Sequence, residues 1–274
     1  MRSSPRDVVA TVRHQIGMIA EYRRIARGEL RTQLLRVEAR WAGFASWLSL
    51  DAGDSQMHDY WADRAVRLAS EAGYDDMVAW MRMRQSQWAI RQPDSRQAIA
   101  FAESGRGTLG AKEKIRAMCA LREAHGHALA NDATSCERRL ANAHALLDEA
   151  HGDDDPAWQG LGQYGASRPY VLAGEARCWL RLRPAKAIAM FEDALRAWPR
   201  DRTRGRGIHQ ARLALACAAA GEPERAAAEG LEALDIARTT RSDVTVQELT
   251  RLDRRLAACD TPAAADFREA FATL

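Results

Sequence analysis

The stretch that decides the fold is PYVLAGEARCWLRLRPAKAIAMFEDALRAWP, residues 169–199. It predicts two short helices joined by a tight turn at Arg183-Pro184. The second helix carries one stripe of small and apolar residues at the helical spacing of i, i+4, i+7 and i+8: Ala187, Phe191, Ala194 and Leu195. Two small residues on one face allow a partner helix to approach closely, and the aromatic ring fills the space between them.

This pattern recurs along the chain, as it must if one hairpin cannot bury its own apolar face. The second small position is filled by Ala65, Gly105, Ala143, Ala194 and Ala233. The first small position is filled by His58, Ala98, Cys136, Ala187 and Ala226, of which His58 fits least well. The turns before them read Gly53-Asp54, Pro93-Asp94, Asn131-Asp132, Arg183-Pro184 and Gly221-Glu222. Five such hairpins predict an all-α, right-handed α-solenoid of tetratricopeptide (TPR) type, with about thirteen helices.

The repeats also predict the domain organisation. Residues 1–29 form an N-terminal helix, residues 30–241 form five TPR-like repeats, and residues 242–274 form capping helices at the C-terminal end. An insert at 151–168 interrupts the regular spacing of the repeats, and loops of this length usually have a function or are disordered. Its aromatic residues, Trp158 and Tyr164, either fold over the concave face as a lid or pack on the edge of a repeat.

Composition excludes several classes of protein. The net charge of +3 is too small to indicate nucleic-acid or membrane binding, and no apolar run is long enough to span a bilayer. The N-terminus lacks the features of a signal peptide, so we expect a cytoplasmic protein. The five cysteines form no CxxC pair and fall within predicted helices, which favours reduced thiols packed as small apolar groups.

No catalytic motif is present, and we predict neither an enzyme nor a cofactor. The chain has no Gly-x-Ser-x-Gly elbow, no HExxH sequence and no dinucleotide-binding fingerprint. The strongest candidate for metal chemistry is His125-Gly126-His127. Residues two apart on a helix point in different directions, so these histidines do not readily share one ion, and no metal site is predicted.

Four runs carry a family resemblance: WAGFASWLSLDAGD (41–54), ASEAGYDD (69–76), LREAHGHALAND (121–132) and GEPERAAAEGLEAL (221–234). Together they resemble the C-terminal TPR half of actinobacterial helix-turn-helix regulators of the Xre type. The resemblance covers the chain from about residue 30 onward. It implies a sensor or dimerisation module. The DNA-binding domain of those regulators is not represented in this sequence, so direct nucleic-acid binding by this chain is not expected.

Aligning the repeats by their small positions also aligns their first helices, which line the concave face of a TPR stack. One inward position reads Phe44, Arg84, Arg122, Ala173 and Arg212, and the position one turn later reads Trp47, Gln87 and His125. Trp80 and Met118 occupy a neighbouring inward position at the start of these helices, and Trp47, Trp80 and Met83 would supply apolar anchors. Because guanidinium pairs bidentately with carboxylate or phosphate, these residues predict a groove for an anionic ligand. Alternatively, the arginines pair with Glu123 or with aspartates on neighbouring helices.

Two functions therefore remain open. The first is a regulatory module that holds a peptide, a protein tail or a small anionic ligand in its groove. The second is an adaptor or homodimeric scaffold, which would expose an apolar patch outside the groove, on the first or last helix. A biosynthetic enzyme is a third hypothesis, and the sequence favours it less. A peptide or protein partner is expected in either of the first two cases, and contact with a membrane is expected in neither.

Overall fold

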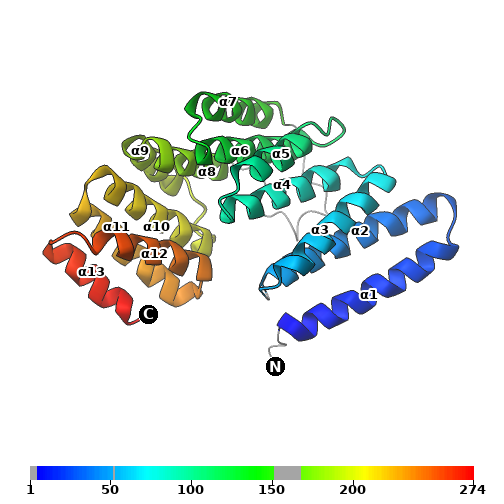
Figure 1. The fold of residues 1–274 in the computed structure, drawn as a ribbon, viewed down its shortest axis with the longest axis horizontal. Coiled ribbons are helices and arrows are strands. Elements are labelled where there is room, and N and C mark those ends of the chain that lie inside the picture. The colour runs from blue at the N-terminus through cyan, green and yellow to red at the C-terminus, as the bar shows by residue number, and fades with distance from the viewer. Residues whose placement is uncertain (1–4, 52, 151–167) are drawn as a thin grey trace. The chain divides into compact units, whose positions relative to one another are not determined.

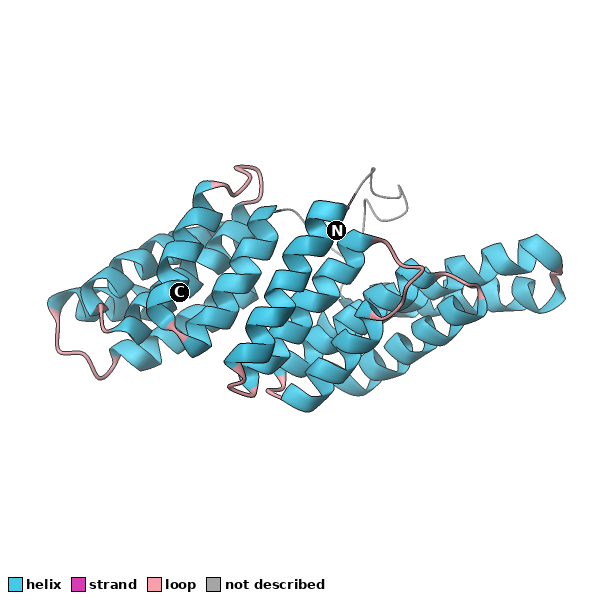
Figure 2. Ribbon diagram, turned by 90° about the horizontal axis from the view of Figure 1, so that it is seen from above, coloured by secondary structure: helices cyan, strands magenta, loops and turns pink. Residues whose placement is uncertain are grey.

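The computed structural model describes residues 5–51, 53–150 and 168–274 of the chain. These residues fold into helices joined by turns and include no strand (Figure 2), which confirms the all-α prediction for the described ranges. Their thirteen helices are, in order, α1 (Pro5–Ile25), α2 (Gly28–Asp51), α3 (Ser55–Glu71), α4 (Asp75–Arg91), α5 (Ser95–Arg106), α6 (Glu113–Leu129), α7 (Ala133–Glu149), α8 (Arg168–Leu182), α9 (Pro184–Arg196), α10 (Thr203–Ala220), α11 (Pro223–Thr240), α12 (Asp243–Leu256) and α13 (Pro262–Ala272).

The chain divides into two compact units. The first comprises Met1–Gly126 and Ala141–His151, and the second comprises His127–Leu140 and Gly152–Leu274. Helices α1 to α5 belong wholly to the first unit and α8 to α13 to the second, whereas α6 and α7 contribute residues to both. Among the residues described, no helix combines the length and the apolar character that crossing a membrane requires.

Within each unit, consecutive helices pack as hairpins that stack on their neighbours (Figure 1). In the first unit, α2 packs on α3 and α4 on α5, while α4 also contacts α2 and α3. In the second unit, α8 packs on α9 and α10 on α11, while α10 also contacts α8 and α9. The last two helices cover the end of this arrangement, since α12 packs on α10 and α11, and α13 packs on α11 and α12.

Small residues permit these close approaches. All ten positions of the small-residue pattern are buried, and even His58, the least suitable of them, is almost fully enclosed. Its Nδ1 lies 2.8 Å from the Ser46 hydroxyl and 3.0 Å from the Ser46 carbonyl oxygen, and its ring meets the edge of Trp88. The imidazole therefore replaces a small side chain by finding polar and aromatic partners in the hairpin contact.

The hairpin turns repeat one hydrogen-bonding scheme. The backbone N–H of Asp54, Asp94, Asp132 and Glu222 each donates to the carbonyl oxygen five residues earlier, at 2.8–3.0 Å. The residue before it adopts a left-handed conformation at Gly53, Asn131 and Gly221, as a Schellman-type helix end requires. The three aspartates then cap the next helix, each accepting a hydrogen bond from the backbone N–H three residues later.

Helix α1 is held to the first hairpin by a buried carboxylate. Glu38 of α2 is 0% exposed and accepts hydrogen bonds from Arg23 of α1 and Arg64 of α3, both at 2.7 Å. Arg23 is thus held by an ion pair with Glu38, whereas Ile25, the last residue of α1, is 72% exposed.

Candidate functional site

In the first unit, the predicted groove residues form three pairs with the same spacing along the chain, one pair each on α2, α4 and α6. Phe44 and Trp47 are paired on α2, Arg84 and Gln87 on α4, and Arg122 and His125 on α6. Each pair spans three residues, which places both side chains on one face of their helix. Helix α2 contacts α4, and α4 contacts α6 through the Cys119 thiol, which donates to the carbonyl oxygen of Ala79 at 3.4 Å.

The aromatic pair on α2 is the most accessible part of this face. The rings of Phe44 and Trp47 stack with centroids 5.7 Å apart, and Trp41 meets the edge of Phe44 at 6.2 Å. Trp47 is 46% exposed, whereas Phe44 is half-buried beneath it. An indole held by stacking and still exposed to solvent offers a rigid apolar surface to a ligand.

On α4, Arg84 and Gln87 lie at the surface, whereas Met83, one of the expected apolar anchors, is buried. Arg84 Nη1 donates to Gln87 Oε1 at 2.9 Å, and both side chains are partly buried, as is Trp80. Met83, by contrast, is 1% exposed. Adjacent helical residues differ by about 100° in direction, and Met83 points into the interior together with Met77 and Met81. Met83 therefore belongs to the core and not to a ligand surface.

On α6, the predicted residues are enclosed. Arg122, His125 and Met118 are all buried, and Arg122 Nη1 lies 3.2 Å from His125 Nδ1. A guanidinium only donates, so Nδ1 is the acceptor and carries no hydrogen in this contact. Glu123, the acid expected to neutralise these arginines, pairs with Arg106 of α5 at 2.7 Å. Arg122 thus lies within the packed structure, and a ligand would reach it only if neighbouring side chains moved.

Arg212, in the second unit, is engaged by an acid on a neighbouring helix. Its Nε donates to Glu248 of α12 at 2.9 Å, and Arg251 lies 2.8 Å from the other carboxylate oxygen. Burial alone would raise the pKa of Glu248, but the positive charges of Arg212, Arg177 and Arg251 outweigh it and bring that pKa to about 2. The alternative prediction, an ion pair between helices, therefore describes Arg212, and its place among the ligand-binding residues is corrected.

The remaining sequence-derived candidates are the proposed lid and the two histidines that flank Gly126. Trp158 and Tyr164, the proposed lid, lie outside the described residues. His127 Nδ1 is 3.5 Å from Asp132 and belongs to the turn between α6 and α7. Gly126 between the two histidines has a packing role, because a Cβ there would lie 2.6 Å from Ile99 Cγ1 on α5. In the part of the chain that is described, no three His, Cys, Asp or Glu side chains gather as metal ligands.

The cysteines behave as buried apolar groups. Cys119, Cys136, Cys178 and Cys217 are buried and reduced, and Cys259 is partly exposed. Burial raises the pKa of Cys119 to about 12 and that of Cys217 to about 11. Thiols with such values are protonated at neutral pH and therefore are poor nucleophiles and poor metal ligands.

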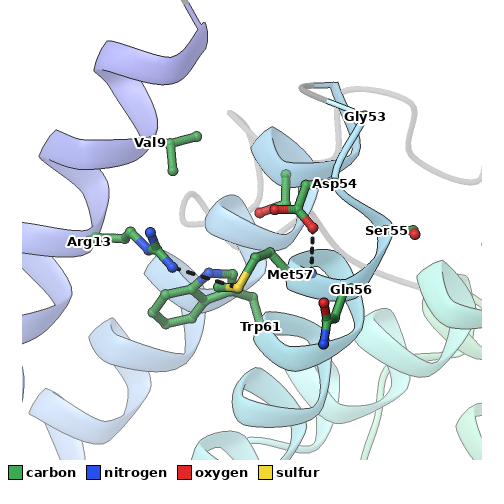
Figure 3. A pocket seen from close by; sticks show the side chains of 9 residues that line it. Val9, Arg13, Gly53, Asp54, Ser55, Gln56, Met57 and Trp61 are labelled. Atoms are coloured by element: carbon green, nitrogen blue, oxygen red, sulfur yellow. Dashed lines mark hydrogen bonds between the residues drawn. The ribbon is translucent and has the colours of Figure 1, made fainter.

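The structure also contains a pocket that sequence reasoning did not find. Its volume is about 430 Å³, and it lies between the first half of α1 and the turn that joins α2 to α3 (Figure 3). Its lining consists of Val9, Arg13, Ser49, Gly53, Asp54, Ser55, Gln56, Met57 and Trp61. The residues of the predicted groove are not among them. Arg13 and Trp61 are 48 positions apart, so no local pattern could have linked them.

The chain matches no protein-family model and no curated protein to which it was compared.

Proposed function

We propose that this chain is a non-catalytic TPR-type α-solenoid that serves as a regulatory module. Its ligand is the acidic or carboxylate end of a peptide or protein tail, held across the first helices of the first unit. The supporting observation is the series of pairs Phe44–Trp47, Arg84–Gln87 and Arg122–His125 at equivalent positions of α2, α4 and α6. A regular spacing of side chains along stacked helices suits an extended ligand. The regulatory role itself rests on the resemblance to the sensor halves of Xre-type regulators.

Within this surface, the side chains have different roles. Trp47 offers an exposed apolar face, and Arg84 supplies a partly exposed guanidinium one helix away. Arg84 already holds Gln87, so its fork is oriented before a ligand arrives, and a fixed donor loses less conformational entropy on binding. The buried Arg122 and His125 support this surface from α6. A carboxylate at Arg84 with an apolar side chain on Trp47 is the simplest mode of binding.

The test uses a library of random peptides synthesised with either a free or an amidated C-terminus, with binding measured by titration calorimetry on the selected peptides. Arg84→Gln should weaken binding of the free-acid peptides by about 1.5–3 kcal/mol, the range for hydrogen bonds to charged groups, and leave the melting temperature unchanged. Trp47→Ala should weaken binding of both kinds of peptide. Arg67→Gln removes an equal charge from the exposed side of α3 and serves as the matched control.

Equal affinity of wild type and Arg84→Gln for the free-acid peptides would exclude this surface as the carboxylate site. Arg122 is less suitable for the experiment. Its side chain is buried against His125, so its replacement should lower stability as well as affinity.

A homodimeric scaffold is the second candidate, and a surface on α1 favours it. Met18, Tyr22 and Ile25 are spaced by four and three residues, so they share one face of α1, and all three are exposed. This agrees with the apolar patch on the first helix that an adaptor is expected to present. Sedimentation at increasing protein concentration should reveal a dimer that Ile25→Glu dissociates. Leu109→Glu, which changes an exposed leucine in a turn, should leave it intact.

A further inference from the structure

The pocket between α1 and the α2–α3 turn contains a cation, Arg13, with which no acidic side chain of the described residues pairs. Arg13 is exposed, and in the described part of the chain its side-chain contact is the sulfur of Met57, 3.6 Å from Nη2. A thioether is a weak acceptor, and a guanidinium presents five donors. No carboxylate of the described residues pairs with Arg13, although most other arginines near the first hairpin hold an acid or an aromatic ring. The guanidinium of Arg13 therefore has donors available in the pocket for an anionic ligand.

A second donor lies at the base of the same pocket. Trp61 is 5% exposed, and its Nε1–H has no hydrogen-bond partner in the described structure. The indole is held in place, since Arg64 lies over its ring at 5.3 Å and Tyr60 meets it edge-on at 5.0 Å. Figure 3 shows its nitrogen edge turned towards the Arg13 guanidinium and the Met57 sulfur. Buried donors of this kind are normally satisfied, and leaving one unpaired is costly.

The first turn of α3 completes the lining and sets the charge that the pocket accepts. Asp54 caps this helix by accepting from the Met57 backbone N–H at 3.0 Å, while the N–H groups of Ser55 and Gln56 have no acceptor within the helix. The carboxylate of Asp54 carries a negative charge at one side of the pocket, and Arg13 carries a positive charge at the other (Figure 3). This balance disfavours a dianion such as sulfate. It favours a monoanion whose far end donates a hydrogen bond.

We propose that this pocket binds a small carboxylate that also bears a hydrogen-bond donor. The ligand carboxylate displaces the Met57 sulfur from Arg13 and accepts from both the guanidinium and the Trp61 indole N–H. The donor at its other end bonds to Asp54. A volume of about 430 Å³ lies within the range of small-molecule sites. This site shares no residue with the groove of the proposed function, so either one can fail without the other.

The test observes the indole N–H directly. 4-Hydroxybenzoate is the probe, because it carries a carboxylate at one end and a phenolic donor at the other. In a proton–nitrogen correlation spectrum of the labelled protein, the signal that disappears in Trp61→Phe should move downfield as the probe is added. Benzoate, which lacks the donor, should bind more weakly. 4-Hydroxybenzamide, which lacks the charge, and inorganic sulfate, a dianion, should leave the signal in place.

Two arginine variants provide the controls. Arg13→Gln should weaken binding of 4-hydroxybenzoate by about tenfold or more, as loss of a charged hydrogen-bond partner implies. Arg24→Gln, on the same helix but outside the pocket lining, should not change it, and neither should Arg84→Gln in the groove. If the Trp61 signal stays in place with both carboxylates, or if Arg13→Gln binds like the wild type, the site is refuted. A response to sulfate equal to that to 4-hydroxybenzoate refutes the assignment to carboxylates.

Discussion

At the scale of single residues, the small positions determine how closely helices pack. Ala194 is fully buried in a cluster with Ala173 of α8 and Trp198, at the contact between the two helices of one hairpin. Each additional methylene at such a place must displace neighbours that are already packed at the density of a crystal. The identity of these residues therefore reflects the space available and not a need for a particular chemical group.

We expect Ala194→Leu to overpack this contact and to lower the free energy of unfolding by about 1–3 kcal/mol. Chemical denaturation monitored by circular dichroism measures the difference. The control is Ala189→Leu, on the exposed side of the same helix, which should leave stability within about 0.5 kcal/mol of the wild type. Equal midpoints for Ala194→Leu and the parent would place Ala194 outside the interface.

At the scale of elements, a few specific contacts hold α1 to the first hairpin. Helix α1 packs on α2, and among the described helices the buried Glu38 links it to that hairpin through Arg23. The same carboxylate also holds Arg64 of α3, so it keeps one partner if the other is lost. Loss of Arg23 should therefore loosen α1 and spare the hairpin.

Hydrogen exchange of the backbone amides can measure the opening of α1 and of α3 separately. In Arg23→Ala, the amides of α1 should exchange faster by an amount equivalent to about 1.5–3 kcal/mol, while those of α3 should keep their protection. Arg24→Ala, which removes a surface pair with Glu21, should have no such effect. Equal acceleration of amide exchange in α1 and α3 would mean that the two helices open together and that the Arg23–Glu38 ion pair does not stabilise α1 separately.

At the scale of the whole molecule, each of the two units contains a buried group that resists protonation. In the first, burial lowers the pKa of His58, with Arg84 and Arg91 acting in the same direction while the Ser46 backbone and Asp59 oppose it. In the second, the arginines around Glu248 lower its pKa from 4.5 to about 2. Both pKa values lie lower in the folded chain than in the unfolded chain. The unfolded state therefore binds more protons, and acid destabilises both units.

The sign of each shift predicts two pH ranges. The contribution of His58 is complete above pH 6.5 and declines as the pH falls below that value. The contribution of Glu248, about 3 kcal/mol, is complete above pH 4.5 and is lost as the pH falls towards 2. Urea unfolding between pH 8 and pH 3 should show both declines. His58→Asn should abolish the first and Glu248→Gln the second, and a profile that is flat in the wild type contradicts both assignments.

The sequence by itself determined the helices, their pairing into hairpins and the turns between them, because these depend on local interactions. Small residues at the helical period, aspartate caps such as Asp94, and a left-handed glycine such as Gly221 each act within a few positions of the chain. The predicted alignment of the first helices likewise found the pairs at Phe44, Arg84 and Arg122, since equivalent places in a repeat meet equivalent neighbours.

Only the tertiary structure decided which of those side chains a ligand can reach. Met83 is buried, and the charge of Arg212 is neutralised by Glu248, 36 positions away in the chain. Ile25 is exposed at the end of its helix. The pocket of Arg13 and Trp61 exists only because α1 lies against the first hairpin. Burial and charge pairing depend on residues that are distant in the chain, and no periodic pattern encodes the meeting of two particular side chains from different elements.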